Sequence, residues 1–331
     1  MTNALITGIT GFVGSHLADL ILEQTDWNVV GMCRWRSPLN NINHLVHRIN
    51  DGNGIRLIYA DLRDTIAVQK AVKDSEPDYV FHLAAQSYPQ TSFNSELDTF
   101  ETNILGTTRL LDAIKTANPK AFIHVCSSSE VYGRAKVIPI KEDTPFHPAS
   151  PYAISKVGTD LVGRYYAEAH GLNVQVTRMF THTGPRRGDV FFESSFAKQI
   201  AMIEAKQIPP VVKVGNLNSM RTICDVRDAV RAYYMLLTVN PVAGSVYNIG
   251  GDYSATVGDI LKTLISMSDV DISIEQDPKR MRPIDADLQV PDCTLFKNHT
   301  GWEPSYKFEQ TMTDLLNYWR NEVRMRWQLQ R

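Results

Sequence analysis

Residues 3–14 of the chain read NALITGITGFVG, and this stretch decides the fold. The apolar run at 3–7 predicts a buried strand, and the helical spacing of apolar residues predicts a helix over 14–24. The turn between them contains three glycines, Gly8, Gly11 and Gly14. A strand, a glycine-rich turn and a helix in this order are typical of dinucleotide binding, because glycine lets the backbone approach a pyrophosphate closely. The N–H groups at the start of the helix then bind the phosphates.

Beyond this turn, short apolar runs alternate with longer segments of helical period. We predict strands at 28–34, 55–60, 79–83, 121–127 and 173–179, and helices at 65–74, 97–118 and 151–170. This alternation predicts an α/β fold with a doubly wound, Rossmann-type parallel sheet and right-handed crossovers.

The alternation changes near residue 180. From there on we predict helices at 194–205, 225–238 and 315–326, and strands at 211–214 and 246–249. We therefore expect a nucleotide-binding domain over 1–180, with return segments near 222–252, and a smaller, partly interleaved α/β substrate domain over 181–331.

Composition restricts the class of protein. The 331 residues include 34 Lys+Arg and 36 Asp+Glu, a formal net charge of −2, and 43% are hydrophobic. Such a chain can bury a core, so disorder is excluded, and its charge balance argues against nucleic acid or an anionic membrane as a partner. The four cysteines show no paired spacing, so we expect no metal site, no disulfides and a cytoplasmic location.

The predicted second strand ends in RWRS, residues 34–37, which contains two arginines and no carboxylate. Sites that prefer NAD usually place Asp or Glu here, against the ribose hydroxyls. Arg34 and Arg36 suit an adenosine 2′-phosphate instead, which makes NADP the predicted cofactor; the alternative is a pair of solvated surface arginines. Asp61 ends the third strand and is placed either against the adenine or as the cap of the next turn.

Two further groups of residues point to chemistry. Tyr152 and Lys156 are four residues apart on a predicted helix, so the phenol and the ammonium share one face. A neighbouring ammonium stabilises a phenolate, so we predict a lowered pKa that makes Tyr152 an acid/base near neutral pH.

Ser128 and Glu130 follow the fifth strand, at the sheet edge where such folds place their chemistry. The alternative is a serine-rich turn whose hydroxyls bind backbone groups.

On these residues the chain resembles the extended short-chain dehydrogenase/reductase family of nucleotide-sugar enzymes, over essentially its whole length. Further matching segments are LAAQ (83–86), DVRD (225–228), YNIG (247–250) and GWEP (301–304). In that family the tyrosine is the acid/base, the lysine binds the nicotinamide ribose, and the residue at Ser128 orients the sugar.

Within the family, the chain is similar to the branch of GDP-mannose 4,6-dehydratases and GDP-4-keto-6-deoxymannose reductases. The similarity lies in RWRS, in PRRGDVF (185–191) and in the segment from Val214 to Arg221. Glu130 matches the residue that removes the C5 proton in the dehydratases, and the UDP-glucose 4-epimerases lack a carboxylate there. The reductases can also carry Glu at this position, so Glu130 does not exclude a reductase. Ser129 stands where the dTDP-glucose dehydratases carry Asp. The chain departs from the branch at Thr181, where the family usually has Asn.

The resemblance implies a GDP-sugar 4,6-dehydratase that converts GDP-mannose into GDP-4-keto-6-deoxymannose. C4 is oxidised, water is eliminated across C5 and C6, and the hydride returns to C6. The alternatives are an NADPH-dependent GDP-4-keto-6-deoxymannose reductase, a nucleotide-sugar epimerase and a non-catalytic NADP sensor. A homodimer or homotetramer is expected.

The resemblance also assigns the site residues. The predicted catalytic residues are Ser128, Glu130, Tyr152 and Lys156. The predicted cofactor contacts are Gly8, Gly11, Phe12, Val13, Gly14, Arg34, Arg36, Asp61, Leu62, Leu83, Ala84, Ala85, Tyr152 and Lys156. The predicted substrate contacts are Gln86, Ser87, Ser128, Ser129, His182, Arg187, Val214, Asn216, Arg221 and Arg282, among which three arginines serve as diphosphate clamps.

Overall fold

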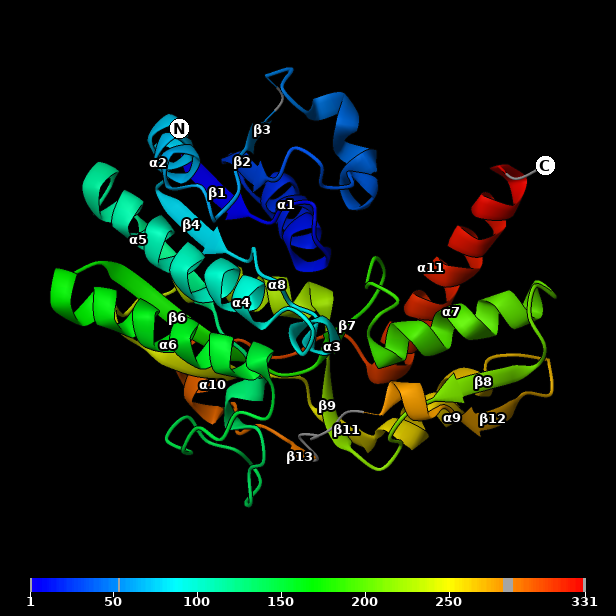
Figure 1. Ribbon diagram of the computed structural model, residues 1–331. Helices are drawn as coiled ribbons and strands as arrows, with labels where there is room; N and C mark the ends of the chain where they lie inside the picture. The colour runs from blue at the N-terminus through cyan, green and yellow to red at the C-terminus, as the bar shows by residue number, and fades with distance from the viewer. Residues whose placement is uncertain (1, 53, 282–287, 330–331) are drawn as a thin grey trace.

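The computed structural model describes residues 2–52, 54–281 and 288–329, and within these ranges its main body is a seven-stranded parallel sheet (Figure 1). The strand order is β10-β6-β5-β4-β1-β2-β3. The strands are β1 (Asn3–Thr7), β2 (Asn28–Cys33), β3 (Ile55–Tyr59), β4 (Tyr79–His82), β5 (Phe122–Cys126), β6 (Asn173–Met179) and β10 (Val246–Ile249). The predicted doubly wound sheet is confirmed.

Helices cover both faces of this sheet. On one face lie α1 (Phe12–Gln24) and α8 (Val226–Thr238), and on the other lie α2 (Thr65–Ser75), α5 (Gly106–Ala117) and α6 (Pro151–His170). Successive strand residues point to opposite faces, so in β1 the side chain of Leu5 packs beneath α2 and α5 while that of Ile6 packs beneath α1 and α8. Both faces are therefore apolar, as the continuous apolar strands predicted.

The helix predicted at 97–118 is interrupted. It consists of α4 (Glu96–Phe100), a π-helical turn η2 (Glu101–Leu105) and α5. Within η2, the Asn103 amide accepts from the backbone N–H of Gln86 and donates to its carbonyl, and also donates to Ser155 Oγ at 2.9 Å. These contacts tie the loop after β4 to α6, so the widened turn serves the sheet edge where the site lies.

After β6 the chain builds a second group of elements, at the lower right of Figure 1. Its helices are α7 (Phe192–Glu204), α9 (Val257–Ile265) and α11 (Phe308–Leu329), whereas α10 (Thr294–Thr300) lies under the main sheet and contacts β10. Its strands are β7 (His182–Thr183), β8 (Val211–Val214), β9 (Met220–Asp225), β11 (Tyr253–Thr256), β12 (Ser273–Gln276) and β13 (Leu288–Gln289). Strand β9 pairs with β7, β11 and β13, and β8 pairs with β12.

The second half also returns to the main sheet, because α8 and β10 complete it. Residues of α7, α9 and α11 share a separate apolar core that includes Phe196, Leu261 and Leu315. A nucleotide-binding domain ending near residue 180, with return segments near 222–252, remains our proposal for the domain organisation. Within the described ranges, no helix combines the length and the apolar character that crossing a lipid bilayer requires.

Candidate active site

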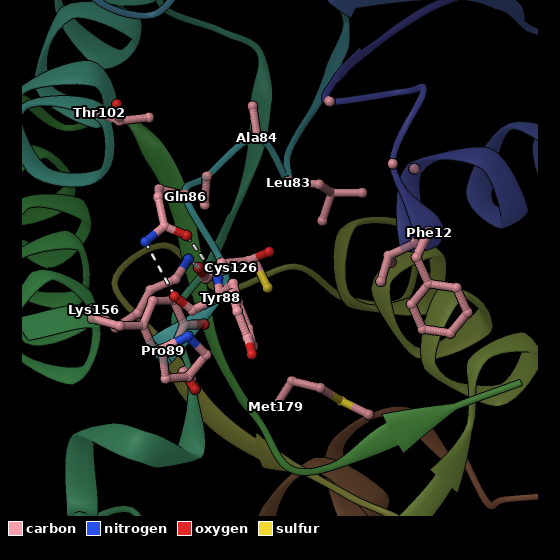
Figure 2. A pocket seen from close by; sticks show the side chains of 18 of the residues that line it. Phe12, Leu83, Ala84, Gln86, Tyr88, Pro89, Thr102, Cys126, Lys156 and Met179 are labelled. Carbon is pink, nitrogen blue, oxygen red and sulfur yellow. Dashed lines mark hydrogen bonds between the residues drawn. The ribbon is translucent and has the colours of Figure 1, made fainter. Parts of the chain in front are cut away.

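A cavity of about 610 Å³ opens at the carboxyl ends of the central strands (Figure 2). Its wall consists of the glycine-rich turn after β1, the residues that follow β2 to β6, and the first turns of α6 and α7. Arg221 of β9 completes the wall from the second half of the chain. This is the edge at which open parallel sheets bind their ligands, because the strand ends and helix N-termini meet there.

The glycine-rich turn suits a dinucleotide. Gly8 has a φ of +76°, and a Cβ atom at this position would lie 2.9 Å from Ala84 Cα, so a side chain here would be strained and crowded. Gly11 is the N-cap of α1, without a side-chain cap, and the first turn of α1 contains no acidic residue. This helix N-terminus therefore presents N–H groups and a positive dipole end to the cavity, which fits a cofactor pyrophosphate.

Charged side chains lie at the ends of β2 and β3. Arg34, Asp61 and Arg63 line the cavity. Arg63 donates to both carboxylate oxygens of Asp61, at 3.1 and 2.8 Å, and these hydrogen bonds, with added charge from Arg34, lower the pKa of Asp61. Arg36 does not line this cavity. Its guanidinium instead lies over the exposed Trp35, 4.5 Å from the ring centroid. Arg34 is thus better placed than Arg36 for the predicted cofactor contact.

The four predicted catalytic residues line one cavity. Ser128 ends the loop after β5, and its hydroxyl accepts from the backbone N–H of Glu130 at 3.2 Å, which starts the short helix η3 (Ser129–Tyr132). Tyr152 and Lys156 lie one turn apart on α6. The Lys156 ammonium donates to the Cys126 carbonyl at 2.6 Å and lies 5.9 Å from the centroid of the Tyr152 ring.

The start of α6 places the tyrosine. Ser150 is the N-cap and accepts from the backbone N–H of Ala153 at 3.0 Å, with Pro151 as the first helical residue. The backbone N–H of Tyr152 then donates to Ser92 Oγ at 3.0 Å, on the short helix α3 (Pro89–Ser92). The sequence predicted this helix start, but not the contact with Ser92.

The pKa of Tyr152 differs from the prediction. Burial raises it above the usual value for a phenol, whereas a hydrogen bond with Ser128 and the positive charge of Arg187 lower it. Burial likewise lowers the pKa of Lys156. The expectation of a lowered Tyr152 pKa from the neighbouring lysine is wrong for this structure, because desolvation by burial is the largest cause of the shift and raises the pKa.

The loop after β6 brings two predicted substrate residues to the same cavity. The His182 ring stacks on Phe12, with centroids 5.8 Å apart, and burial together with the charge of Arg187 lowers its pKa to about 3. The Arg187 guanidinium lies 3.5 Å from the centroid of the Phe191 ring, and its Nε lies 3.5 Å from Glu193 Oε1. Neither Phe191 nor Glu193 was predicted as a site residue. The signal that could have found them is the carboxylate of Glu193 directly after two phenylalanines.

The other predicted contacts divide into three groups. The cavity is also lined by Phe12, Val13, Gly14, Leu62, Leu83, Ala84, Ala85, Gln86, Ser87, Ser129 and Arg221. Val214 and Asn216 do not line it: Val214 is buried in β8, and the Asn216 amide donates to Ser219 Oγ at 2.9 Å. Arg282 lies outside the described residues. The binding role of every one of these residues stays a prediction.

Several lining residues were missed by sequence reasoning. Tyr88 and Pro89 lie beside Gln86 and Lys156 in Figure 2, and Met179 lines the cavity further away. The Gln86 amide donates to the Tyr88 carbonyl at 3.1 Å, which folds this loop back on itself. The position of Tyr88 and Pro89, in the loop that follows a predicted strand, was the signal that could have found them.

The fold and the cavity define the class of protein, an enzyme of the short-chain dehydrogenase/reductase type that works with a nicotinamide cofactor. The solved structure of RMD from Pseudomonas aeruginosa, complexed with NADPH, matches with a TM-score of 0.81 at 29% identity, over 97% of this chain and 100% of that one. UDP-glucose 4-epimerase from Thermotoga maritima, solved with UDP-glucose, matches with a TM-score of 0.84 at 26% identity, over 97% and 100% of the two chains.

Sequence relatives narrow the class. The family model described as GDP-mannose 4,6 dehydratase matches residues 5–315. The GDP-mannose 4,6-dehydratase of Yersinia enterocolitica is 31% identical over 96% of this chain and 93% of its own length. The GDP-6-deoxy-D-mannose reductase of Pseudomonas aeruginosa is 30% identical over 98% of this chain and 99% of its own length. The chain belongs to the GDP-mannose 4,6 dehydratase family, which confirms the predicted family of nucleotide-sugar enzymes.

Proposed function

We propose that the chain is an NADP-dependent GDP-sugar 4,6-dehydratase, with GDP-mannose as the first substrate to test. One observation carries this proposal: Glu130 lines the same cavity as Tyr152 and Lys156. A tyrosine and a lysine suffice for oxidation at C4, but elimination of water also needs a base for the C5 proton. A carboxylate in the same cavity supplies that base.

The residues take the following roles. The Ser128 hydroxyl holds the sugar O4, and Tyr152 as phenolate removes the O4 proton while Lys156 keeps the phenolate charge balanced. A bound nicotinamide would supply the hydride chemistry needed at C4 and C6. The resulting 4-ketone acidifies the C5 proton, which Glu130 removes as the C6 hydroxyl leaves as water. The product is a 4-keto-6-deoxy sugar.

NADP rather than NAD is part of the proposal. Arg34 lines the cavity at the end of β2, and a guanidinium there suits a 2′-phosphate. The one carboxylate that lines the cavity at the end of β3, Asp61, is paired with Arg63. The Pseudomonas relative was solved with NADPH, which supports the same preference.

Substrate binding and assembly extend the proposal. Arg187 and Arg221 line the cavity and suit a nucleotide diphosphate, since a guanidinium pairs with two phosphate oxygens. A homodimer or homotetramer is supported by exposed apolar side chains on α6, namely Ile154, Leu161 and Tyr165. The four cysteines are free thiols, which supports a cytoplasmic location.

A GDP-4-keto-6-deoxymannose reductase is the second candidate. It is favoured by the similarity to the Pseudomonas reductase, which covers 98% of this chain and 99% of the reductase. A reductase uses the same Ser128, Tyr152 and Lys156, but it consumes NADPH and needs no base at C5. An epimerase is less well supported, because the carboxylate of Glu130 then has no role, and a sensor leaves the Tyr/Lys pair without one.

Incubation of the purified protein with GDP-mannose and a trace of NADP⁺ tests the proposal. A dehydratase forms the 4-keto sugar in large excess over the cofactor, with no net change in NADPH. If GDP-mannose is not turned over, and NADPH is instead oxidised by the GDP-4-keto-6-deoxy sugar, the dehydratase assignment is wrong and the reductase replaces it.

A further inference from the structure

One face of α1 holds the loop that follows β6. Phe12, His16 and Asp19 are spaced i, i+4 and i+7 along α1, so their side chains share one face of the helix. Phe12 lines the cavity from the first turn of α1 (Figure 2), whereas His16 and Asp19 do not line it. The loop over residues 182–188 packs on this face and carries Arg187 into the same cavity. The helix that suits the cofactor pyrophosphate therefore also holds a loop with a charged cavity residue.

Arg186 joins the loop to this face of α1. Its Nη2 donates to Asp19 Oδ2 at 2.6 Å and to His16 Nδ1 at 2.7 Å. The His16 Nε2–H donates in turn to the Pro185 carbonyl at 2.9 Å. A guanidinium only donates and a carbonyl only accepts, so these two contacts assign the His16 tautomer, with its proton on Nε2. Burial and the charge of Arg186 lower the pKa of His16 to about 4, so near pH 7 its Nδ1 can accept.

The same guanidinium reaches a third segment. Arg186 Nη1 donates to the Asn41 carbonyl at 3.1 Å, in the segment after β2. The Asn41 side-chain amide donates to the Thr10 carbonyl at 3.1 Å, inside the glycine-rich turn. His44, from the same segment as Asn41, places its Nε2 2.7 Å from Asp19 Oδ1. Arg186 thus connects the loop after β6 with two segments that border the cofactor end of the cavity.

The backbone of Arg186 supports a functional role for these contacts. Its φ is +71°, in the left-handed region that residues other than glycine seldom adopt. Such a conformation is costly and persists only where the surrounding structure enforces it, most often at functional sites. Arg186 points to α1, and the next residue, Arg187, points into the cavity, where its guanidinium lies 5.1 Å from the centroid of the Phe12 ring.

We propose that Arg186, His16 and Asp19 are positioning residues, which fix the loop after β6 so that Arg187 is held in place to bind a diphosphate in the cavity. The diphosphate is that of the nucleotide sugar or that of the cofactor, and the two arms of the test below separate these sources. The inference rests on the proposed function for the nucleotide sugar alone, since the nicotinamide cofactor follows from the class of protein. A guanidinium that is held in advance binds more tightly, because less freedom is lost on binding.

Arg186→Asn is the central variant. It removes the three guanidinium contacts but keeps a residue type that tolerates the left-handed backbone. Affinity for the diphosphate ligand should fall about ten-fold, as expected when one charge-assisted contact is weakened. Asp19→Asn removes only the ion pair with Arg186 and should cause a smaller loss. Because Arg186 acts through Arg187, Arg186→Asn should cause no further loss in a protein that already carries Arg187→Met.

Calorimetric titrations measure these affinities in two arms. Titration with NADP⁺ tests the cofactor diphosphate, and titration of the NADP⁺-saturated protein with GDP tests that of the substrate nucleotide. Arg320→Met is the matched control, because this guanidinium donates to both carboxylate oxygens of Glu204 at 2.7 Å but does not line the cavity. It should leave both affinities unchanged. Hydrogen exchange over residues 182–191 should be faster in Arg186→Asn than in the wild type and the control.

A merely structural role for Arg186 predicts a different result, namely lower thermal stability with both affinities of the folded protein unchanged. That result, or an equal loss from Arg186→Asn with and without Arg187→Met, would overturn the proposal. If the wild type does not bind GDP, the proposed function fails, and the NADP⁺ arm alone decides this inference. Circular dichroism checks that each variant folds, and if Arg186→Asn does not fold, Asp19→Asn carries the same comparisons.

Discussion

The two ends of the cavity are built by different means. The cofactor end is mainly backbone: a glycine turn, a helix N-terminus and the ends of parallel strands. The catalytic and sugar end consists of titratable side chains, among them Glu130, Tyr152, Lys156, Arg187 and Glu193, whose properties depend on burial and on each other. A backbone site is specified locally, whereas a side-chain site requires contacts between segments far apart in the chain.

This difference has an energetic counterpart. At the cofactor end, α1 offers N–H groups whatever the pH. At the other end, burial raises the pKa of Tyr152 and lowers that of Lys156, which favours the neutral form of each side chain. A ligand therefore meets a fixed, pH-independent cradle at one end and a set of coupled charges at the other. Variants at the two ends should fail in different ways.

Tyr152→Phe should have the largest effect on turnover. Loss of the acid/base should lower kcat by about 1000-fold, within the usual range for such a group. The backbone N–H of residue 152 keeps its bond to Ser92 Oγ, so NADP⁺ affinity should stay close to that of the wild type. Steady-state kinetics and a cofactor-binding titration measure the two quantities. Turnover within ten-fold of the wild type would show that another group performs the proton transfer.

Glu130→Gln separates the two halves of the proposed reaction. The amide keeps the size of the side chain but cannot remove the C5 proton, so formation of the 4-keto-6-deoxy sugar should fall by about 100-fold. Oxidation at C4 should persist, and reduced nicotinamide should accumulate on the enzyme when GDP-mannose is added. Stopped-flow absorbance follows that step, and product analysis follows the elimination. Full dehydration by this variant would remove Glu130 from the mechanism.

Gly8→Ala damages the backbone end. A Cβ atom there meets Ala84 Cα at 2.9 Å and the residue has a φ of +76°, so the turn must shift. We expect a loss of about 2 kcal/mol in the free energy of unfolding and weaker NADP⁺ binding. Chemical denaturation and a binding titration measure both. Gly171→Ala, which has a φ of +66° but nothing within 4 Å of its added Cβ, is the matched control for backbone strain alone.

Sequence reasoning succeeded where the signal was local. The glycine turn, the strand alternation and the start of the helix at residue 151 each depend on neighbouring residues, and the structure contains all three. It failed where distant contacts decide. The small strands β9, β11 and β12 lack long apolar runs, and their pairing depends on segments far apart in the chain. The direction of the Tyr152 pKa shift failed for the same reason, because burial cannot be seen in a five-residue motif.

The contrast between Arg34 and Arg36 provides the smallest and most local test of the cofactor end. The two arginines are indistinguishable in sequence, yet Arg34 lines the cavity and Arg36 stacks on Trp35 outside it. Arg34→Ala should weaken NADP⁺ binding about ten-fold, the loss expected for one charge-assisted hydrogen bond, and should leave NAD⁺ binding almost unchanged. Arg36→Ala should change either affinity by less than about two-fold, as expected for a surface side chain. Calorimetric titration of both variants with both cofactors measures this. If the two arginines contribute equally, the segment after β2 rearranges when the cofactor binds, and side chains rather than backbone determine the cofactor preference.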